Sequence, residues 1–430
     1  MSATLQRHLT KQKDGVPAGI YSVCSAHPLV LRAAAELAEA AGSHLLVEAT
    51  SNQVNQMGGY TGMQPAEFRN FVEMIAADAG FPCERLILGG DHLGPNPWRH
   101  LSAGTAMQQA EAMVSAYAQA GFSKIHLDAS MSCKGDPPTL IDTEVAARSV
   151  QLCLAAETAY QPGGEKPVYV IGTEVPTPGG ATHVLDGLAV TSPEAAAHTL
   201  TVHREAFMAH GLTDAWTRVI ALVVQPGVEF DHDSVVHYDR SKARPIVQWR
   251  RQHANDIVFE AHSTDYQNAR AYSGLVEDGF AILKVGPALT FALREALYAL
   301  ADIEAQLIAP AVRSRLAETI EQTMLAHPAV WQPYYAGDAK QQTLLRRYSY
   351  SDRMRYYWNY PEIAAAVDRL ILNLSSTAIP QSMLSLYLPS QYSRMRMGEI
   401  SGDPTSLIVD KVKDVLRVYA RACNQKHRAS

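Results

Sequence analysis

Adjacent acidic and imidazole side chains close one short apolar run of this sequence, at Asp91 and His92. An imidazole can bind a divalent metal, and a carboxylate beside it can give or accept a proton. The glycines of the surrounding segment, GGDHLGPN, would let the backbone approach a ligand closely. Asp91 is therefore a candidate catalytic acid or base, and His92 is a candidate metal ligand. The alternative is a loop in which the aspartate caps a helix and the histidine is merely polar.

Two other runs alternate polar and apolar residues, so the polar side chains of each run point the same way. His126 and Asp128 share one side of the first run, and Glu260 and His262 share one side of the second. We predict Asp128 as a second proton-transfer residue. A divalent metal, zinc or manganese, would have an open position for substrate oxygens here. In the alternative, these side chains only hydrogen-bond to one another. The predicted metal ligands are His92, Glu174 and His262.

Two further segments have the chemistry of a sugar-phosphate site. Residues 47–62 surround Glu48 with amide and hydroxyl side chains that suit a polyol, although such a loop can also satisfy its own backbone. Lys284 precedes a Gly-Pro helix start, where helix N–H groups commonly hold phosphate. Lys284 could instead form a Schiff base, which requires a depressed pKa, or pair with Glu260. We predict Glu48 as catalytic and the following residues as substrate-binding: Asn52, Asn55, His126, Gln225, Ser263, Thr264, Lys284 and Gly286.

These residues lie at the ends of eight apolar, β-branched runs, at 19–24, 44–51, 86–92, 124–130, 168–174, 219–225, 256–262 and 280–286. A helical segment follows each run, as at 28–41 and 65–80. This alternation predicts parallel strands, joined by right-handed crossovers, that close into an α/β fold, the (β/α)8 TIM barrel. Active sites of that fold lie at the C-terminal strand ends. A doubly wound open sheet competes, but no glycine-rich dinucleotide turn follows the first run.

Beyond residue 300 the alternation ends, and the sequence predicts a C-terminal helical extension packed on the barrel. Helical patterns cover 302–327, 341–347, 361–374 and 404–422. We therefore predict a barrel over 1–300 and an extension over 301–430. Arginine and aromatic residues concentrate at 346–358 and 387–396. Guanidinium groups suit phosphate and carboxylate, so this cluster could cap a site or meet a partner chain. An ordinary seam between helices and barrel explains it equally well.

Composition favours a large globular chain. The 430 residues have a formal net charge of −6 with no long block of one sign, which disfavours binding to nucleic acid or to a membrane surface. No apolar run reaches the length of a membrane span, and the N-terminus lacks the apolar core of a secretory signal. The five cysteines form no CxxC pair and indicate reduced thiols. We predict a cytoplasmic protein whose apolar helical faces are compatible with a homo-oligomer.

Long segments of the chain resemble the accessory subunit family of class II D-tagatose-1,6-bisphosphate aldolase, whose members have also been labelled tagatose-6-phosphate kinases. The segments are CSAHPLV (24–30), EATSNQVNQMGGYTGM (48–63), GGDHLGPN (89–96), GFSKIHLDASMSC (121–133), IGTEVPTPGG (171–180), FEAHSTDYQ (259–267) and LKVGPALTFALREAL (283–297). The similarity extends over essentially the whole chain, including YSDRMRYYW (350–358). It implies a non-catalytic subunit of tagatose and galactitol-type carbohydrate catabolism. Such a subunit supports a separate catalytic class II aldolase chain and shares its ketohexose phosphate ligands.

A more distant similarity to the catalytic class II aldolases implies that Asp91 is an acid or base, and that His92 and His262 are zinc ligands. Their remaining histidine ligand is replaced near Glu174. Two functions therefore stay open: an accessory subunit, or a metal-dependent aldolase or C4-epimerase of ketohexose phosphates in which Asp91 or Asp128 moves protons. A tagatose-6-phosphate kinase is disfavoured, because the sequence has no GxxxxGK[ST] loop and no glycine-rich loop paired with HRD. No nucleotide cofactor is expected.

Overall fold

Eight parallel strands form a closed barrel in the computed structural model, which describes residues 2–12, 14–161, 164–173 and 188–423. Around the barrel the strands follow the order β1-β10-β9-β6-β5-β4-β3-β2. Because β1 pairs with both β2 and β10, the sheet closes, which confirms the predicted (β/α)8 barrel and excludes an open doubly wound sheet. The strands are β1 (Ile20–Val23), β2 (Leu45–Thr50), β3 (Leu86–Leu93), β4 (Lys124–Leu127), β5 (Val168–Ile171), β6 (Val219–Val223), β9 (Val258–Ala261) and β10 (Phe280–Val285).

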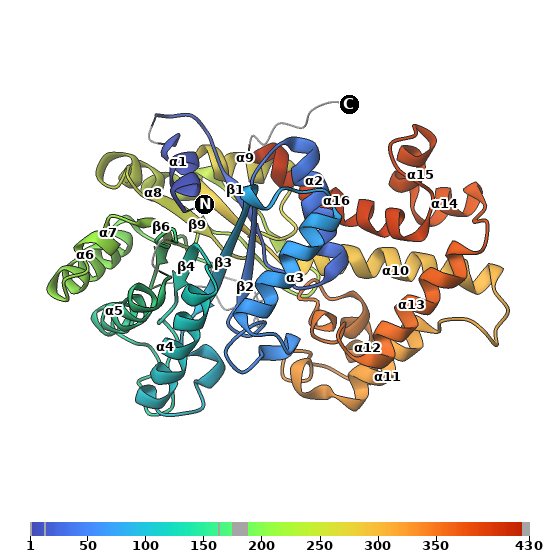
Figure 1. Cartoon of the computed structure of the whole chain (residues 1–430), viewed down its shortest axis with the longest axis horizontal. Coiled ribbons are helices and arrows are strands. Elements are labelled where there is room, and N and C mark those ends of the chain that lie inside the picture. Colours follow the sequence, from blue (N-terminus) through green and yellow to red (C-terminus); the bar gives the residue numbers. More distant parts are fainter. Residues whose placement is uncertain (1, 13, 162–163, 174–187, 424–430) are drawn as a thin grey trace.

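Helices outside the barrel follow the strands along the chain (Figure 1). They are α2 (Pro28–Ala41), α3 (Pro65–Asp78), α4 (Ala103–Gln119), α5 (Asp142–Ala159), α6 (Pro193–Ala209) with the short α7 (Thr213–Trp216), α8 (Arg240–His253), α9 (Ala269–Glu277) and α10 (Pro287–Leu307). A small antiparallel pair, β7 (Glu229–Phe230) and β8 (Val235–Val236), which the sequence patterns did not predict, lies between β6 and α8.

Local sequence explains where these helices begin and end. In α2, Pro28 occupies the first turn, and His27 Nδ1 accepts the Leu29 N–H at 3.3 Å. The helix ends at Gly42, whose φ of 63° lies in the left-handed region that glycine adopts without strain. One face of the helix buries several alanine and leucine side chains against the barrel. These signals are typical of a helix start and stop.

The barrel interior is apolar at the end where the strands begin. Ile20, Leu46, Ile87 and Val258 belong to one buried cluster there. The N-terminal helix α1 (Ser2–Thr10), which the sequence patterns did not predict, adds Leu5 and Leu9 to the same cluster. The helix therefore closes this end of the barrel, and the polar side chains of the interior lie nearer the strand exits.

The chain continues into a helical extension, as predicted, made of α11 (Leu316–Ala326), α12 (Ala339–Tyr348), α13 (Pro361–Ser375), α14 (Gln381–Tyr387), α15 (Pro389–Arg396) and α16 (Pro404–Ala422). In Figure 1, α10 runs from the barrel into this extension, and α16 returns to pack on α10, α2 and α9. The predicted boundary at residue 300 falls inside α10. The division into 1–300 and 301–430 stays a prediction.

The continuous helical stretch predicted over 302–327 is wrong. Helix α10 ends at Leu307, and α11 begins at Leu316. Pro310 lies between them and cannot donate a backbone hydrogen bond, which disfavours a continuous helix. The break is held by Glu304, which is buried and accepts the Ser314 N–H at 3.0 Å.

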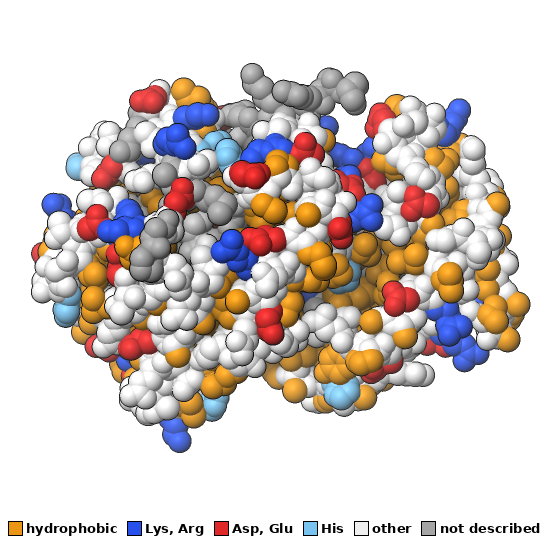
Figure 2. All heavy atoms as spheres, in the orientation of Figure 1, with side chains coloured by type: hydrophobic (Ala, Val, Ile, Leu, Met, Phe, Trp, Pro, Cys, Tyr) orange, Lys and Arg blue, Asp and Glu red, His pale blue; other side chains and the backbone are white. Residues whose placement is uncertain are grey.

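The surface of the molecule carries mixed charges. On the face in Figure 2, lysine and arginine side chains are interspersed with aspartate and glutamate, and hydrophobic side chains line a hollow between the barrel and the extension. Among the described residues, no helix combines the length and the apolar character needed to span a bilayer.

We expect Leu5→Ala to lower the free energy of unfolding by about 2–5 kcal/mol, because it leaves a cavity in a packed apolar layer. Leu5 is 0% exposed, whereas Leu372 in α13 is 69% exposed and offers a matched control. Leu372→Ala should cost no more than about 0.5 kcal/mol. Urea unfolding followed by circular dichroism measures both variants, and equal losses would contradict the role assigned to α1.

Candidate functional site

A buried ion-pair network fills the barrel interior above the apolar layer. Lys124 Nζ on β4 lies 2.9 Å from Glu48 Oε2 on β2 and 2.8 Å from Glu260 Oε2 on β9. All three side chains are 0% exposed. The contact with Glu260 lacks hydrogen-bond geometry, so Glu260 Oε2 has no hydrogen-bond partner. One lysine thus compensates two carboxylates that would be costly to bury alone.

A second lysine extends this network toward the barrel mouth. Lys284 Nζ on β10 lies 2.7 Å from Glu48 Oε2, 2.9 Å from Asp91 Oδ1 and 3.8 Å from Glu260 Oε1. Burial alone would lower the pKa of Lys284, but the negative charges of Asp91 and Glu48 hold it well above its usual range. Lys284 is therefore held as an ammonium group. The geometry does not favour a Schiff-base nucleophile, which needs a depressed pKa.

The glycines before Asp91 make room for protein atoms. Gly89 pairs with Glu48 across the β2–β3 ladder, and a Cβ atom at Gly89 would lie 2.7 Å from Glu48 Cγ. A Cβ atom at Gly90 would lie 2.4 Å from Leu93 Cδ1. The expectation that these glycines admit a ligand is therefore wrong for these two positions, since the space beside them holds side chains of this chain.

A chain of hydrogen bonds joins two carboxylates through two histidines at the strand exits. Asp128 Oδ2 lies 2.8 Å from His92 Nδ1, His92 Nε2 lies 3.1 Å from His262 Nδ1, and His262 Nε2 lies 2.9 Å from Glu260 Oε1. If both rings donate to their carboxylates, one more proton must lie between the two facing nitrogens. Otherwise two lone pairs would meet there.

The pKa shifts indicate which ring carries that proton. Burial would lower the pKa of His92, but the charges of Asp91 and Asp128 raise it above its usual value. Burial lowers the pKa of His262 to about 4, although Glu260 opposes this shift. We therefore infer that His92 is the ring that carries the extra proton. The neutral His262 ring then accepts a hydrogen bond from His92 Nε2 at its Nδ1. For Asp128, burial is outweighed by the hydrogen bond from His92, which holds the pKa of the carboxyl below its usual range.

Asp91 and His126 complete the mouth. Burial would raise the pKa of Asp91, but the charges of His92 and Lys284 and the hydrogen bond with His126 hold it well below its usual range. His126 Nδ1 lies 3.0 Å from Asp91 Oδ1 and 3.2 Å from the His92 backbone nitrogen. His126 Nε2 is buried without a hydrogen-bond partner. A buried imidazole nitrogen without a hydrogen-bond partner is a candidate metal ligand.

Four of these side chains can together hold a metal ion. Asp91, His126, Glu260 and His262 each offer a ligand atom, and the four atoms lie within 4.8 Å of one another. Two nitrogens and two carboxylate oxygens suit a divalent cation. Of the three ligands predicted from sequence, His262 belongs to this group, and His92 lies beside it. Glu174 lies outside the described residues.

Backbone strain occurs at two strand exits of the site. His92 has a φ of 50° and Ser263 has a φ of 52°, both in the left-handed region that non-glycine residues seldom adopt. His92 follows Asp91 on β3, and Ser263 follows His262 just after β9. Strain of this kind clusters at functional sites, where the surrounding structure must hold it in place.

The loop residues predicted to bind substrate make contacts within the chain. Asn55 Oδ1 accepts the Met57 N–H at 2.9 Å and the Gly59 N–H at 3.1 Å, which is the self-satisfied turn considered as the alternative. Gln225 Oε1 accepts the Gly227 and Val228 N–H groups at 2.8 and 3.0 Å. Asn52 is partly buried in the same loop as Asn55. Their role toward a substrate stays a prediction.

The start of α10, predicted as a phosphate cradle, already holds a carboxylate of this chain. Asp265 Oδ1 accepts the Gly286 N–H at 3.0 Å and the Ala288 N–H at 2.9 Å. Burial raises the pKa of Asp265 to about 6, although these two hydrogen bonds oppose the shift. Thr264 Oγ1 donates to the Lys284 carbonyl at 2.6 Å. A phosphate at this helix start would therefore have to displace Asp265.

Sequence reasoning missed Lys124 as a member of the site and left Glu260 outside the predicted ligands. Both have a readable signal, because Lys124 precedes His126 by two residues on β4 and Glu260 precedes His262 by two on β9. Residues two apart on a strand share one face.

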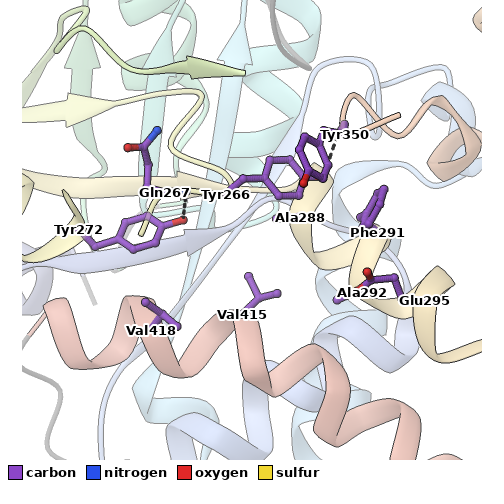
Figure 3. Close-up of a pocket in the computed structure, with 10 residues that line it drawn as sticks. All are labelled: Tyr266, Gln267, Tyr272, Ala288, Phe291, Ala292, Glu295, Tyr350, Val415 and Val418. Carbon is purple, nitrogen blue, oxygen red and sulfur yellow. Dashed lines mark hydrogen bonds between the residues drawn. The ribbon is translucent and has the colours of Figure 1, made fainter. Parts of the chain in front are cut away.

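The extension covers part of the mouth face through residues 350–358. Tyr350 stacks on Tyr266 with ring centroids 4.3 Å apart, and the Tyr266 hydroxyl donates to the Tyr350 carbonyl at 2.8 Å. Figure 3 shows this pair at one end of a pocket between the loop after β9, α10 and α16. Trp358 packs edge-on against His27, with centroids 5.4 Å apart. The loops after β1 and β9 therefore both contact this segment.

We expect Lys124→Met to lower the free energy of unfolding by about 3–5 kcal/mol, because it leaves buried carboxylates without their compensating charge. Lys166 offers a matched control, since its Nζ pairs with Asp214 at 2.7 Å but its side chain is 44% exposed. Lys166→Met should leave the unfolding midpoint nearly unchanged. Denaturant titration of both variants decides the question, and an unchanged midpoint in Lys124→Met would contradict the network.

Comparisons with known proteins agree with this architecture. A family model described as D-tagatose-1,6-bisphosphate aldolase subunit GatZ/KbaZ-like matches residues 5–424. The D-tagatose-1,6-bisphosphate aldolase subunit GatZ of Escherichia coli K12 is 53% identical over 416 residues, which cover 96% of this chain and 99% of that protein. The same subunit of Shigella boydii serotype 18 has the same identity and coverage.

A solved structure described as a probable tagatose 6-phosphate kinase from Sinorhizobium meliloti has a TM-score of 0.87 to this chain. It is 51% identical, and the match covers 94% of this chain and 100% of that one. Identity and coverage at this level extend over the barrel and the helical extension alike. The chain therefore belongs to the D-tagatose-1,6-bisphosphate aldolase subunit GatZ/KbaZ-like family.

Proposed function

We propose that this chain is the accessory subunit of a D-tagatose-1,6-bisphosphate aldolase and supports a separate catalytic class II aldolase chain. The observation that carries the proposal is the 53% identity, over 96% of the chain, to proteins named as subunits of that aldolase. The work of such a subunit is to bind and stabilise its partner. A ketohexose phosphate ligand, a homo-oligomer and a cytoplasmic location remain predictions from sequence.

The electrostatics of the mouth support an accessory role. A general acid or base works best with a pKa near the working pH. Asp91 instead has a pKa well below its usual range, and Lys284 has a pKa well above its own. Asp91 is held in the charged state by His92 and Lys284, and Lys284 is held by Asp91 at 2.9 Å and by Glu48. This pairing suits a stable core better than proton transfer.

A second candidate function is catalysis by this chain, as a metal-dependent aldolase or C4-epimerase of ketohexose phosphates. The group formed by Asp91, His126, Glu260 and His262 favours it. His126 Nε2, which is buried without a hydrogen-bond partner, fits a cation such as zinc or manganese. A bound cation would polarise a ketose carbonyl oxygen. Asp128, held ionised by His92, would accept or return a proton beside it.

A kinase has less support. The relative described as a probable tagatose 6-phosphate kinase is similar over 94% of this chain, but this sequence has no GxxxxGK[ST] loop to hold nucleotide phosphates.

The accessory role predicts no aldolase turnover by the purified chain alone. Mixing it with a catalytic class II tagatose-bisphosphate aldolase chain should lengthen the half-life of activity at elevated temperature, because binding stabilises the folded partner. A coupled assay with tagatose 1,6-bisphosphate measures both quantities. Full turnover without the partner would overturn the accessory role, and Asp91→Asn and Asp128→Asn would then test the two carboxylates that the sequence assigns to proton transfer.

The metal group predicts binding of Zn²⁺ or Mn²⁺ by the chain after chelator treatment and dialysis. His126→Ala and His262→Ala should each weaken binding by at least about tenfold, because each removes a ligand atom. His253, an exposed histidine on α8, supplies the control variant His253→Ala. Isothermal titration with each metal salt measures the affinities. Equal affinity in all three variants would rule out this ligand set.

A further inference from the structure

Two arginines of the extension have no carboxylate partner in the described part of the chain. Arg353 is 5% exposed, its Nε has no hydrogen-bond partner, and its guanidinium carbon lies 3.3 Å from the Tyr334 ring centroid. Arg355 donates to the carbonyl oxygens of Ser351 and Asp352 and, at 2.8 Å, to the Tyr356 hydroxyl. In the part of the chain that the structure describes, the polar and ring partners of these two side chains are thus aromatic rings, carbonyls and a hydroxyl.

Two other arginines of the extension are paired with carboxylates. Arg346 pairs with Glu321, and Arg394 pairs with Asp410 at 2.7 Å. A buried guanidinium without a counter-charge is costly, and it is a common feature of sites that receive an anion.

The acidic groups nearest Arg355 are engaged with other partners. Asp352 Oδ2 accepts the Thr290 hydroxyl at 2.6 Å, and Asp352 Oδ1 lies 3.2 Å from Arg294. Asp265 Oδ1 accepts the backbone N–H groups at the start of α10. Neither carboxylate lies within 4.0 Å of Arg355, although both contribute to its electrostatic environment. The positive charge of the Arg355 guanidinium is therefore not paired with a carboxylate and can attract an added anion.

The two arginines lie on the mouth side of the barrel. The Tyr356 ring lies near both guanidinium groups, at 5.7 Å from Arg353 and 4.5 Å from Arg355. It packs edge-on against Tyr60 of the loop after β2, with ring centroids 4.9 Å apart. The charge of Arg355 acts on Asp265 in the loop after β9. Both loops follow the C-terminal ends of strands, where this fold binds its ligands.

The local potential is positive. Burial alone would raise the pKa of Tyr356, but the charges of Arg355 and Arg353 hold it below its usual value. The helix N-terminus that commonly receives phosphate in this fold is occupied by Asp265. Binding of an anion to the two guanidinium groups would therefore cost less free energy than binding at the start of α10, where the anion would have to displace Asp265.

We infer that Arg353 and Arg355 form an anion site at the barrel mouth that holds the phosphate group of a small phosphorylated ligand. Arg355, whose Nη1 already donates to two carbonyls and whose Nη2 donates to Tyr356, offers its remaining N–H groups to the phosphate oxygens. Arg353 adds a second positive charge, and its stacking on Tyr334 fixes the position of its guanidinium group. The inference rests on the proposed function only in naming the ligand as a sugar phosphate, since free inorganic phosphate offers the same chemistry.

Isothermal titration of the full chain tests the site with three probes: tagatose 1,6-bisphosphate, inorganic phosphate and unphosphorylated tagatose. We expect the two phosphates to bind, with an affinity that falls as salt rises, and tagatose not to bind. Arg355→Gln should weaken phosphate binding by at least about tenfold, and Arg355→Lys by less, because lysine keeps the charge but loses the guanidinium N–H groups. Arg396→Gln removes an exposed arginine on α15 and should change nothing.

Thermal unfolding of the same variants separates binding from structure. An unchanged affinity in Arg355→Gln would overturn the site, and a lowered Tm without a change in affinity would assign Arg355 to packing instead. Equal affinity for inorganic phosphate and for the bisphosphate supports the site and identifies free phosphate as the ligand. If the chain binds phosphate through Arg355 but does not stabilise the aldolase partner, the anion site stands and the accessory role falls.

Discussion

The closed barrel depends on compensating the charges that it buries. Lys124 lies between Glu48 and Glu260, and Lys284 lies between Glu48 and Asp91, at distances of 2.7 to 2.9 Å. The effective cost of burying an ion without a partner is several kcal/mol, so each carboxylate needs its lysine. These partners lie on different strands, and therefore the network constrains how the strands are aligned around the barrel.

The same network decides what chemistry the mouth can support. Asp91 and Lys284 neutralise each other, so neither has the intermediate pKa of a proton-transfer group. The polar capacity that remains lies at His126 Nε2, which has no hydrogen-bond partner. The mouth thus has the residue types of an active site, but its charges are arranged for stability around a group of four side chains that can hold a cation. This combination is what we expect of a subunit whose barrel assists another chain.

The helical extension changes the surroundings of the mouth. Tyr350, Tyr356 and Trp358 contact loops that follow three strands of the barrel, and α16 packs against α2, α9 and α10. Residues distant in sequence thereby bring arginine to the side of the barrel where ligands bind. Asp265 already accepts the N–H groups at the start of α10. The positive charge that would attract an anion near the mouth therefore comes from the arginines of the extension.

The sequence by itself determined the barrel and much of its mouth. Eight apolar runs with polar exits predict parallel strands buried on both faces, and the spacing by two of His126 with Asp128 and of Glu260 with His262 predicts a shared direction, because side chains alternate along a strand. Only the tertiary structure decided the partners. Glu48 and Lys284 are 236 residues apart, and closure of the sheet brings them together. The pairing of Lys124 with Glu48 and Glu260 and the occupation of the α10 start by Asp265 likewise follow from contacts between strands and loops that lie apart in the sequence, which local patterns do not encode.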